Sequence, residues 1–238
     1  MSGPHDTFGA AEGPSTEDVG GVVMEWWGLV LAALLGLGTA LWLGRRRYRY
    51  DDDVVHHTAP GWLSAGTVFL GALLAVPFAL DWSVARTLTY LLAWVWAVAL
   101  MVIDLDVRRL PDRLTLPAYP AAAVLLTLCS WAEQRWEALA WAAACAGGAV
   151  LVYLVLALIA AGSEGLGLGD VKLAGVLGGL LGWLAPMTAV LGLLTGFILG
   201  GVIAAVLLLS RRAGRRSYVS YGPVMVLGAY PWVLLGTG

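Results

Sequence analysis

The chain has 238 residues, of which 60% are hydrophobic and only 13% charged, and its formal net charge is -2. A soluble domain carries about 25% charged residues, so this composition excludes an ordinary soluble protein and predicts an integral membrane protein. No basic surface is indicated, and we therefore expect the lipid bilayer, and no nucleic acid, as a partner of the chain.

The first 23 residues differ in composition from the rest of the chain. They are polar and acidic, rich in Gly, Pro and Ser, and they contain no Lys or Arg. A cleavable signal peptide begins with basic residues, so this segment lacks the pattern of one. Its composition is typical of a disordered segment. We therefore expect a disordered polar tail over residues 1–23 and a membrane-embedded domain over residues 24–238.

Eight apolar runs follow this tail. A helix needs about 20 apolar residues to cross the roughly 30 Å of hydrocarbon in a bilayer. The runs cover residues 24–44, 61–80, 84–103, 114–131, 138–161, 171–184, 187–209 and 222–235. A tight "LAPM" turn joins the sixth and seventh runs, because Pro186 favours a break between helices. The sequence thus predicts an all-α fold, a polytopic membrane helix bundle of about eight transmembrane helices. Frequent small residues in its second half favour close helix packing.

Lys and Arg are unevenly distributed between the two sides of the predicted bundle. If the amino terminus lies outside, the cytoplasmic loops hold 12 of the 14 basic residues, and only Arg86 and Arg135 remain outside. Basic residues are retained on the cytoplasmic side of membrane proteins, and the opposite orientation would reverse this ratio. We therefore predict that both termini lie outside.

Two aspartates lie where an apolar run meets the predicted cytoplasmic boundary. Asp104 ends the third run in "MVIDLDVRRLPDRLTLP", and Asp170 begins the sixth run in "GLGLGDVKL". Because both lie at one membrane depth, their carboxylates can meet although they belong to separate helices. Ionisable residues within membrane segments suggest a functional site.

Ordinary helix-end roles are the alternative for both aspartates. Asp170 would then lie near a helix amino terminus, where the helix dipole favours an anion, and Asp104 would pair with Arg108 one turn away. The three glycines of "GLGLGD" favour the functional interpretation. They remove side chains before Asp170 and permit backbone conformations that other residues avoid, so that a substrate or another helix can approach closely.

Three aspartates compete for the place opposite Asp170. Residues two positions apart on a helix point about 200° apart, so Asp104 and Asp106 face nearly opposite directions and only one can face Asp170. Pro111 breaks the helix before Asp112, which places Asp112 in a loop or at the start of the next helix, where it would cap that helix. Asp104 lies deepest in the apolar run, and we therefore prefer it.

Three blocks of the sequence resemble those of a known family. The blocks "IDLDVRRLPDRLTLP", "GLGLGDVKLAGVLGGLLGW" and "YVSYGPVMVLGAY" look like the signature blocks of bacterial type IV prepilin peptidases, which are intramembrane aspartyl proteases of the GxGD type. The blocks occur in the same order, and the resemblance covers roughly residues 84–236. By this resemblance Asp104 and Asp170 are the catalytic pair, Gly167 and Gly169 form the GxGD loop, and Lys172 belongs to the same block.

The resemblance implies a prepilin leader peptidase of the cell membrane whose active site faces the cytoplasm. Its substrates would be pilin-like precursors, which carry a short basic leader, a Gly before the cut and an apolar helix after it. Two close carboxylates share a proton, so one accepts a proton from water while the other hydrogen-bonds the scissile carbonyl. We expect no cofactor and no metal in this reaction.

The sequence departs from the family in the loop after the first helix. Larger members carry two CxxC pairs there and also methylate the new amino terminus with S-adenosylmethionine, whereas the 17 residues from Gly44 to Pro60 contain no cysteine. His56 and His57 are adjacent and lack the spacing of a tetrahedral metal site. Such a loop is too short to build a cofactor pocket of roughly 300 Å³ or more. We therefore expect a short-form peptidase without methyltransferase activity.

Two other kinds of function are compatible with the sequence. A transporter or ion-relay protein could use Asp104 and Asp170 to pass protons or ions, although the chain shows no paired halves with matching interrupted helices. A noncatalytic assembly factor for pili or secretion could keep the fold for its glycine-rich packing alone. Proteases of the presenilin and signal peptide peptidase type also use GxGD, but they expect a PAL motif where this chain has "YGPVMVLG".

Overall fold

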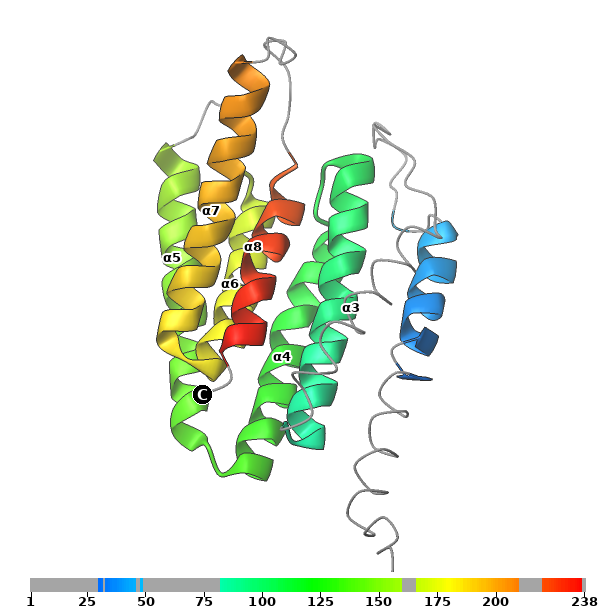
Figure 1. Cartoon of the computed structure of the whole chain (residues 1–238), viewed down its shortest axis with the longest axis vertical. Coiled ribbons are helices and arrows are strands. Elements are labelled where there is room, and N and C mark those ends of the chain that lie inside the picture. Colours follow the sequence, from blue (N-terminus) through cyan, green and yellow to red (C-terminus); the bar gives the residue numbers. More distant parts are fainter. Residues whose placement is uncertain are drawn as a thin grey trace, which may run out of the picture.

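The computed structural model describes residues 30–31, 33–45, 48, 82–159, 166–209 and 220–236. These described residues form helices and no strand, which confirms the predicted all-α class (Figure 1). The labelled helices are α3 (Val84–Val107), α4 (Asp112–Glu133), α5 (Trp136–Ile159), α6 (Leu168–Leu184), α7 (Pro186–Leu209) and α8 (Tyr221–Leu235). A further apolar helix, Ala33–Gly44, precedes them.

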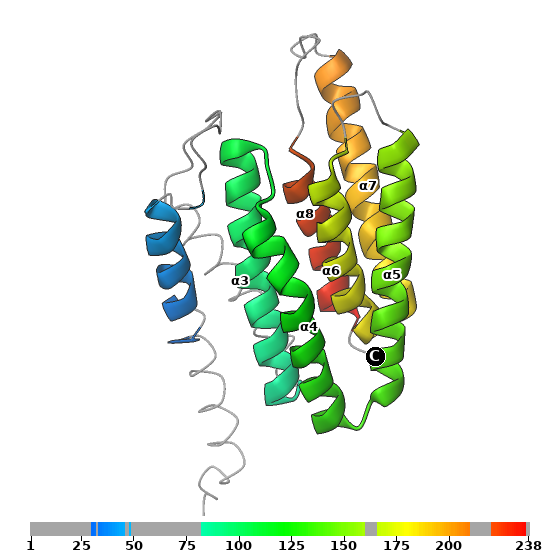
Figure 2. The same ribbon diagram turned by 180° about the vertical axis from the view of Figure 1, so that it is seen from behind.

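The helices run alternately in opposite directions along one bundle (Figures 1 and 2). The connections α3–α4, α4–α5 and α6–α7 are short, and consecutive helices joined by a few residues pack antiparallel. Consequently α3 ends, α4 begins, α6 begins and α8 begins at the same end of the bundle. This end also carries basic residues, namely Arg108, Arg109, Arg113 and Lys172, and we call it the basic end.

Four of the described helices are long and apolar enough to cross a membrane: α3, α4, α5 and α7 over residues 186–206. They support the predicted integral membrane protein. The short sixth run is the 17-residue helix α6, and the "LAPM" turn lies at Ala185 between α6 and α7, as predicted. The predicted run 61–80 lies outside the described residues, as does the tail 1–23, so the count of about eight spans stays a prediction.

α3 is longer than its apolar run. The run ends at Ile103, but the helix continues to Val107, where Arg108 adopts the left-handed conformation with φ 52° and closes the last turn. A helix continues past the end of a hydrophobic run when nothing in the backbone interrupts it, and Pro111 provides the interruption only later. Asp104 is therefore held within the last turn of α3, not in a loop.

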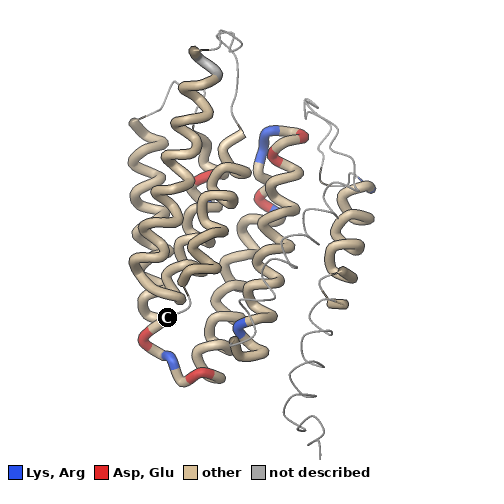
Figure 3. Tube along the Cα trace, in the orientation of Figure 1, with Lys and Arg blue, Asp and Glu red and all other residues tan. Residues whose placement is uncertain are grey.

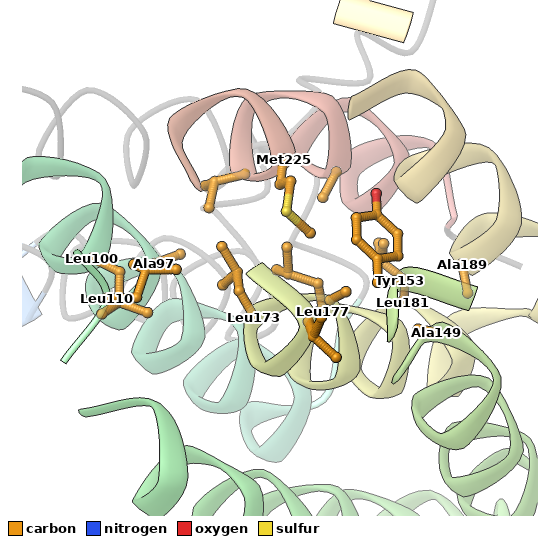
Figure 4. Packing of buried hydrophobic residues seen from close by; sticks show 14 residues of the cluster. Ala97, Leu100, Leu110, Ala149, Tyr153, Leu173, Leu177, Leu181, Ala189 and Met225 are labelled. Atoms are coloured by element: carbon orange, nitrogen blue, oxygen red, sulfur yellow. The ribbon is translucent and has the colours of Figure 1, made fainter. Parts of the chain in front are cut away.

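α6 lies at the centre of the bundle, and most of its residues are buried. Figure 4 shows Leu173, Leu177 and Leu181 of α6 packed with Met225 of α8 and Tyr153 of α5. The small residues on α6 bring it close to its neighbours, as the sequence predicted. A Cβ atom at Gly178 would lie 2.7 Å from the Ala149 Cβ of α5, and one at Gly182 would lie 2.5 Å from the Cys145 Cβ.

The end opposite the basic end holds both arginines that the charge distribution assigned to the outside. Arg86 forms an ion pair with Glu133, and its guanidinium lies 5.2 Å from the ring centre of Trp183. Arg135 stacks on the same ring at 4.8 Å. Figure 3 shows these charges gathered near the α4–α5 connection. Each of these two arginines thus has an acidic or aromatic partner, which reduces the cost of holding its charge among apolar helices.

Candidate active site

Asp104 lies in the last turn of α3, and its side chain is buried, with 5% relative exposure. Its Oδ2 atom accepts a hydrogen bond from the Ser220 hydroxyl at 2.6 Å and another from the Gly222 backbone N–H at 3.0 Å. Both donors belong to the start of α8. A buried carboxylate needs such donors because removing it from water without compensation is costly.

Gly222 has a steric reason to be glycine. A Cβ atom at this position would lie 2.8 Å from Asp104 Oδ2 and 3.3 Å from its Cγ. Contacts under 3.0 Å between such atoms require one of them to move, so any larger residue displaces the carboxylate or the helix. The absence of a side chain therefore allows the backbone of α8 to approach Asp104 closely enough to donate to it.

Asp170 occupies the third position of α6 and is also buried, with 8% relative exposure. Its Oδ2 accepts a hydrogen bond from the Gly167 backbone N–H at 2.9 Å, so Asp170 caps the amino terminus of its own helix. Asp170 thus lies near the amino terminus of a helix, as the alternative interpretation of this residue expected, and the dipole of α6 favours an anion there. Asp170 also interacts electrostatically with Asp104, and both buried carboxyl groups lie at the basic end of the bundle.

The glycines before Asp170 act by packing. Gly167 adopts an extended conformation, φ -97° and ψ 164°, which any residue can adopt, so the expected special backbone conformation is not found there. A Cβ atom at Gly169 would lie 3.0 Å from the Cβ of Leu110. Gly169 therefore allows the α3–α4 connection to pack against the start of α6. Gly165, the first of the three, lies outside the described residues.

Lys172 does not lie between the two aspartates. Its Nζ atom bonds Asp112 Oδ1 at 2.5 Å, and the Asp112 side chain is 61% exposed. A pair this exposed contributes about 0–1 kcal/mol to stability. Asp112 is the first residue of α4, as expected, but the predicted cap is wrong: Pro111 occupies the N-cap position and no side chain caps the helix. The carboxylate instead reaches Lys172 on α6.

Asp106 faces a different part of the molecule from Asp104, as their spacing predicted. Its side chain is 1% exposed, and its Oδ2 accepts a hydrogen bond from the Tyr48 hydroxyl at 2.7 Å. Nearby, Leu43 packs with Ile103 and Val107 of α3. Asp104 lies deeper in the apolar run of the sequence, but Asp106 is the more deeply buried side chain in the structure. Position along the run therefore does not predict which of the two aspartates is more buried. Asp106 joins α3 to the segment that follows the helix Ala33–Gly44.

The start of α8 supplies site residues that sequence reasoning did not single out. Ser220 and Gly222 bond Asp104, and Tyr221 between them interacts electrostatically with Asp170. The buried Tyr221 hydroxyl finds no hydrogen-bond partner in good geometry among the described residues. All three residues lie in the block "YVSYGPVMVLGAY", so the signal was present in the sequence, but the block alone assigned no role to any of them.

An apolar groove of about 590 Å³ opens between α5 and α7. Its lining is almost entirely hydrophobic, and Tyr153 and Cys145 are the titratable side chains within it. General acid–base chemistry needs a proton donor or acceptor with a suitable protonation state. The groove offers no carboxylate, so we place the candidate chemistry at the paired aspartates of the basic end.

The chain is similar to proteins of one known family. Residues 90–209 match the type IV leader peptidase family. A protein of Aeromonas hydrophila named prepilin leader peptidase/N-methyltransferase is 39% identical over 113 residues, a stretch covering 47% of this chain and 37% of the relative. No solved structure matches the chain. The family match includes Asp104 and Asp170 but ends before Ser220.

Proposed function

The chain belongs to the type IV leader peptidase family, and on that premise we propose that it is a leader peptidase in which Asp104 and Asp170 activate water. One observation carries this proposal: two buried aspartates from separate helices interact at one end of the bundle. Aspartates that only cap helix ends would not have to lie near each other.

The hydrogen bonds suggest how the pair would work. Oδ2 of each aspartate is occupied, in Asp104 by donors from α8 and in Asp170 by the Gly167 N–H. Among the described residues no donor reaches either Oδ1 atom, which leaves these oxygens for water and the scissile carbonyl. Two adjacent carboxyl groups share one proton. The ionised group then takes a proton from the attacking water while the protonated group hydrogen-bonds the carbonyl oxygen. No covalent acyl-enzyme forms.

Substrate and membrane orientation are further parts of the proposal. The substrate would be a pilin-like precursor with a short basic leader, a Gly before the cut and an apolar helix. The basic end of the bundle would face the cytoplasm, where positive residues are retained. We place the protein in the plasma membrane with about eight spans and both termini outside. Gly167, Gly169 and Lys172 would support the loop that carries Asp170, with Lys172 acting through its contact with Asp112.

We propose that methyltransferase activity is absent. The Aeromonas hydrophila relative is named for both activities, but the match covers 37% of its length. Support comes from the sequence of the loop 44–60, which lacks the cysteines of larger family members and is short for a cofactor pocket. The residues of this loop, including His56 and His57, lie outside the described part of the chain apart from residues 44, 45 and 48.

Cleavage by the purified protein tests the peptidase proposal. The full chain, in lipid nanodiscs, is incubated with a peptide that carries a basic leader, a Gly and an apolar helix, and the products are identified by mass spectrometry. We expect a shortened product, and Asp104→Asn or Asp170→Asn should lower the rate by about 100-fold or more, because asparagine cannot exchange the proton. Glu137→Gln, which changes an exposed carboxylate at the opposite end of the bundle, is the control and should cleave normally.

The same preparation separates the alternative functions. Substantial cleavage by Asp170→Asn would refute the two-aspartate mechanism. An ion-relay protein would be identified by a different result: the unmodified chain carries protons or ions into liposomes but cleaves no peptide, and both asparagine variants lose this flux. Absence of both activities with normal binding of a precursor would identify an assembly factor.

A further inference from the structure

Ser220 occupies the N-cap position of α8, but its hydroxyl does not cap that helix. A serine at this position ordinarily accepts a hydrogen bond from the N–H of the second or third helical residue. In α8 these residues are Gly222 and Pro223. Proline has no N–H, and the Gly222 N–H donates to Asp104. The Ser220 oxygen therefore accepts no capping hydrogen bond from these two residues, and its O–H donates to Asp104 Oδ2 at 2.6 Å.

Asp104 therefore caps α8 from another helix. The first turn of any helix has N–H groups without partners inside the helix, and its dipole favours an anion. The carboxylate of α3 meets this need, although Asp104 lies 116 residues from Ser220 in the sequence. The contact links the position of α8 to the orientation of one candidate catalytic side chain.

Both donors bond the same oxygen, and this limits how the carboxylate can rotate. A carboxylate held by one donor can still turn about its terminal side-chain bond, whereas two donors from different directions fix its plane. Oδ1 receives no hydrogen bond from the described residues, and it is therefore the oxygen that a water or a carbonyl group can meet. Among the described residues, Arg108 at the end of α3 acts electrostatically on Asp104, and Asp104 in turn acts on Asp170 of α6.

We propose that Ser220 is a positioning residue of the active site, whose hydroxyl holds Asp104 Oδ2 so that Oδ1 faces the reacting water. The inference rests on the proposed peptidase function and adds a role for α8. Correct orientation of a catalytic group contributes to the rate of the chemical step and little to substrate binding. Ser220 should therefore act on kcat, not on KM.

Three substitutions at this position test the proposal with the full chain in nanodiscs and the leader peptide described above. Ser220→Ala removes the hydroxyl, Ser220→Cys keeps its size but offers only a weak donor, and Ser220→Thr keeps the hydroxyl. Loss of a hydrogen bond to a charged group should lower kcat by about 10- to 100-fold in the Ala and Cys variants, with KM unchanged. The Thr variant should stay within about threefold of the unmodified chain. Thr127→Ala removes an exposed hydroxyl that bonds its own helix at Ala123 and should have no effect.

Thermal unfolding and size-exclusion chromatography report whether each variant is folded. Unchanged kcat in Ser220→Ala, or a Thr variant as slow as the Ala variant, would overturn the proposal. Failure of the nearly isosteric Cys variant to fold would also overturn it, because the role would then be structural. These outcomes leave the peptidase function intact as long as the unmodified chain cleaves and Asp170→Asn does not. Absence of cleavage by the unmodified chain would remove the peptidase proposal and this one with it.

Discussion

Replacing Gly222 with alanine tests the contact between α8 and Asp104 through the backbone. The new methyl carbon would lie 2.8 Å from Asp104 Oδ2, 3.3 Å from its Cγ and 3.5 Å from its Cβ. An ordinary contact between carbon and oxygen is about 0.5 Å longer than the first of these distances. Either the carboxylate turns away or the start of α8 moves outward, and in both cases the Gly222 N–H loses its acceptor.

The expected magnitudes separate stability from activity. Overpacking at a buried position costs about 1–3 kcal/mol, whereas alanine in a helix is favoured over glycine by about 1 kcal/mol. The net change in the free energy of unfolding is therefore small, about 0–2 kcal/mol. Activity responds more strongly, because a hydrogen bond to a charged group is worth about 1.5–3 kcal/mol. If this interaction is needed in the transition state, kcat falls by about 10- to 100-fold.

Gly201→Ala is the matched control, because it is the same substitution in another helix and no atom lies within 4 Å of the new Cβ. Initial cleavage rates and thermal unfolding are measured for both variants alongside the unmodified chain. We expect normal cleavage by Gly201→Ala and slow cleavage by a folded Gly222→Ala. Equal rates in the two variants would refute the argument that the close approach of α8 holds Asp104 in its working position.

Three further predictions concern other parts of the molecule. Asp106→Asn should leave cleavage intact and lower the free energy of unfolding by about 0.5–1.5 kcal/mol, because the amide oxygen still accepts a hydrogen bond from Tyr48 but carries no charge. Thermal unfolding measures this change. Loss of cleavage by the folded variant would show that Asp106 has a role in the reaction. Reporter domains fused after Arg49 and after Arg216 should report the cytoplasm, and an external signal from either would contradict the predicted orientation. The mature substrate should show no added methyl group by mass spectrometry in the presence of S-adenosylmethionine, whereas a methylated product that depends on this protein would show a second activity.

The sequence alone determined the class of the fold and the ends of most described helices. The apolar runs at 138–161 and 187–209 lie within a few residues of α5 and α7, and Pro186 marks the start of α7. These features depend on local properties, because the thickness of the bilayer sets the length of a run and proline interrupts a helix where it stands. The alternation of direction then follows from short connections. For this reason local features of the sequence are sufficient to assign Asp104 and Asp170 to one end of the bundle.

Only the tertiary structure decided which side chains meet at that end. Ser220 and Gly222 donate hydrogen bonds to Asp104. Asp106 accepts a hydrogen bond from Tyr48, and Lys172 bonds Asp112 instead of either candidate catalytic aspartate. In a soluble helix the apolar stripe indicates which face packs inward. The helices of this protein are apolar on nearly every side, because side chains that face lipid and side chains that face the protein interior are both apolar. The packing of such helices depends on small residues and on shape. The rotation of α8 about its axis, which brings its first N–H groups to Asp104, therefore leaves no periodic signal in the sequence.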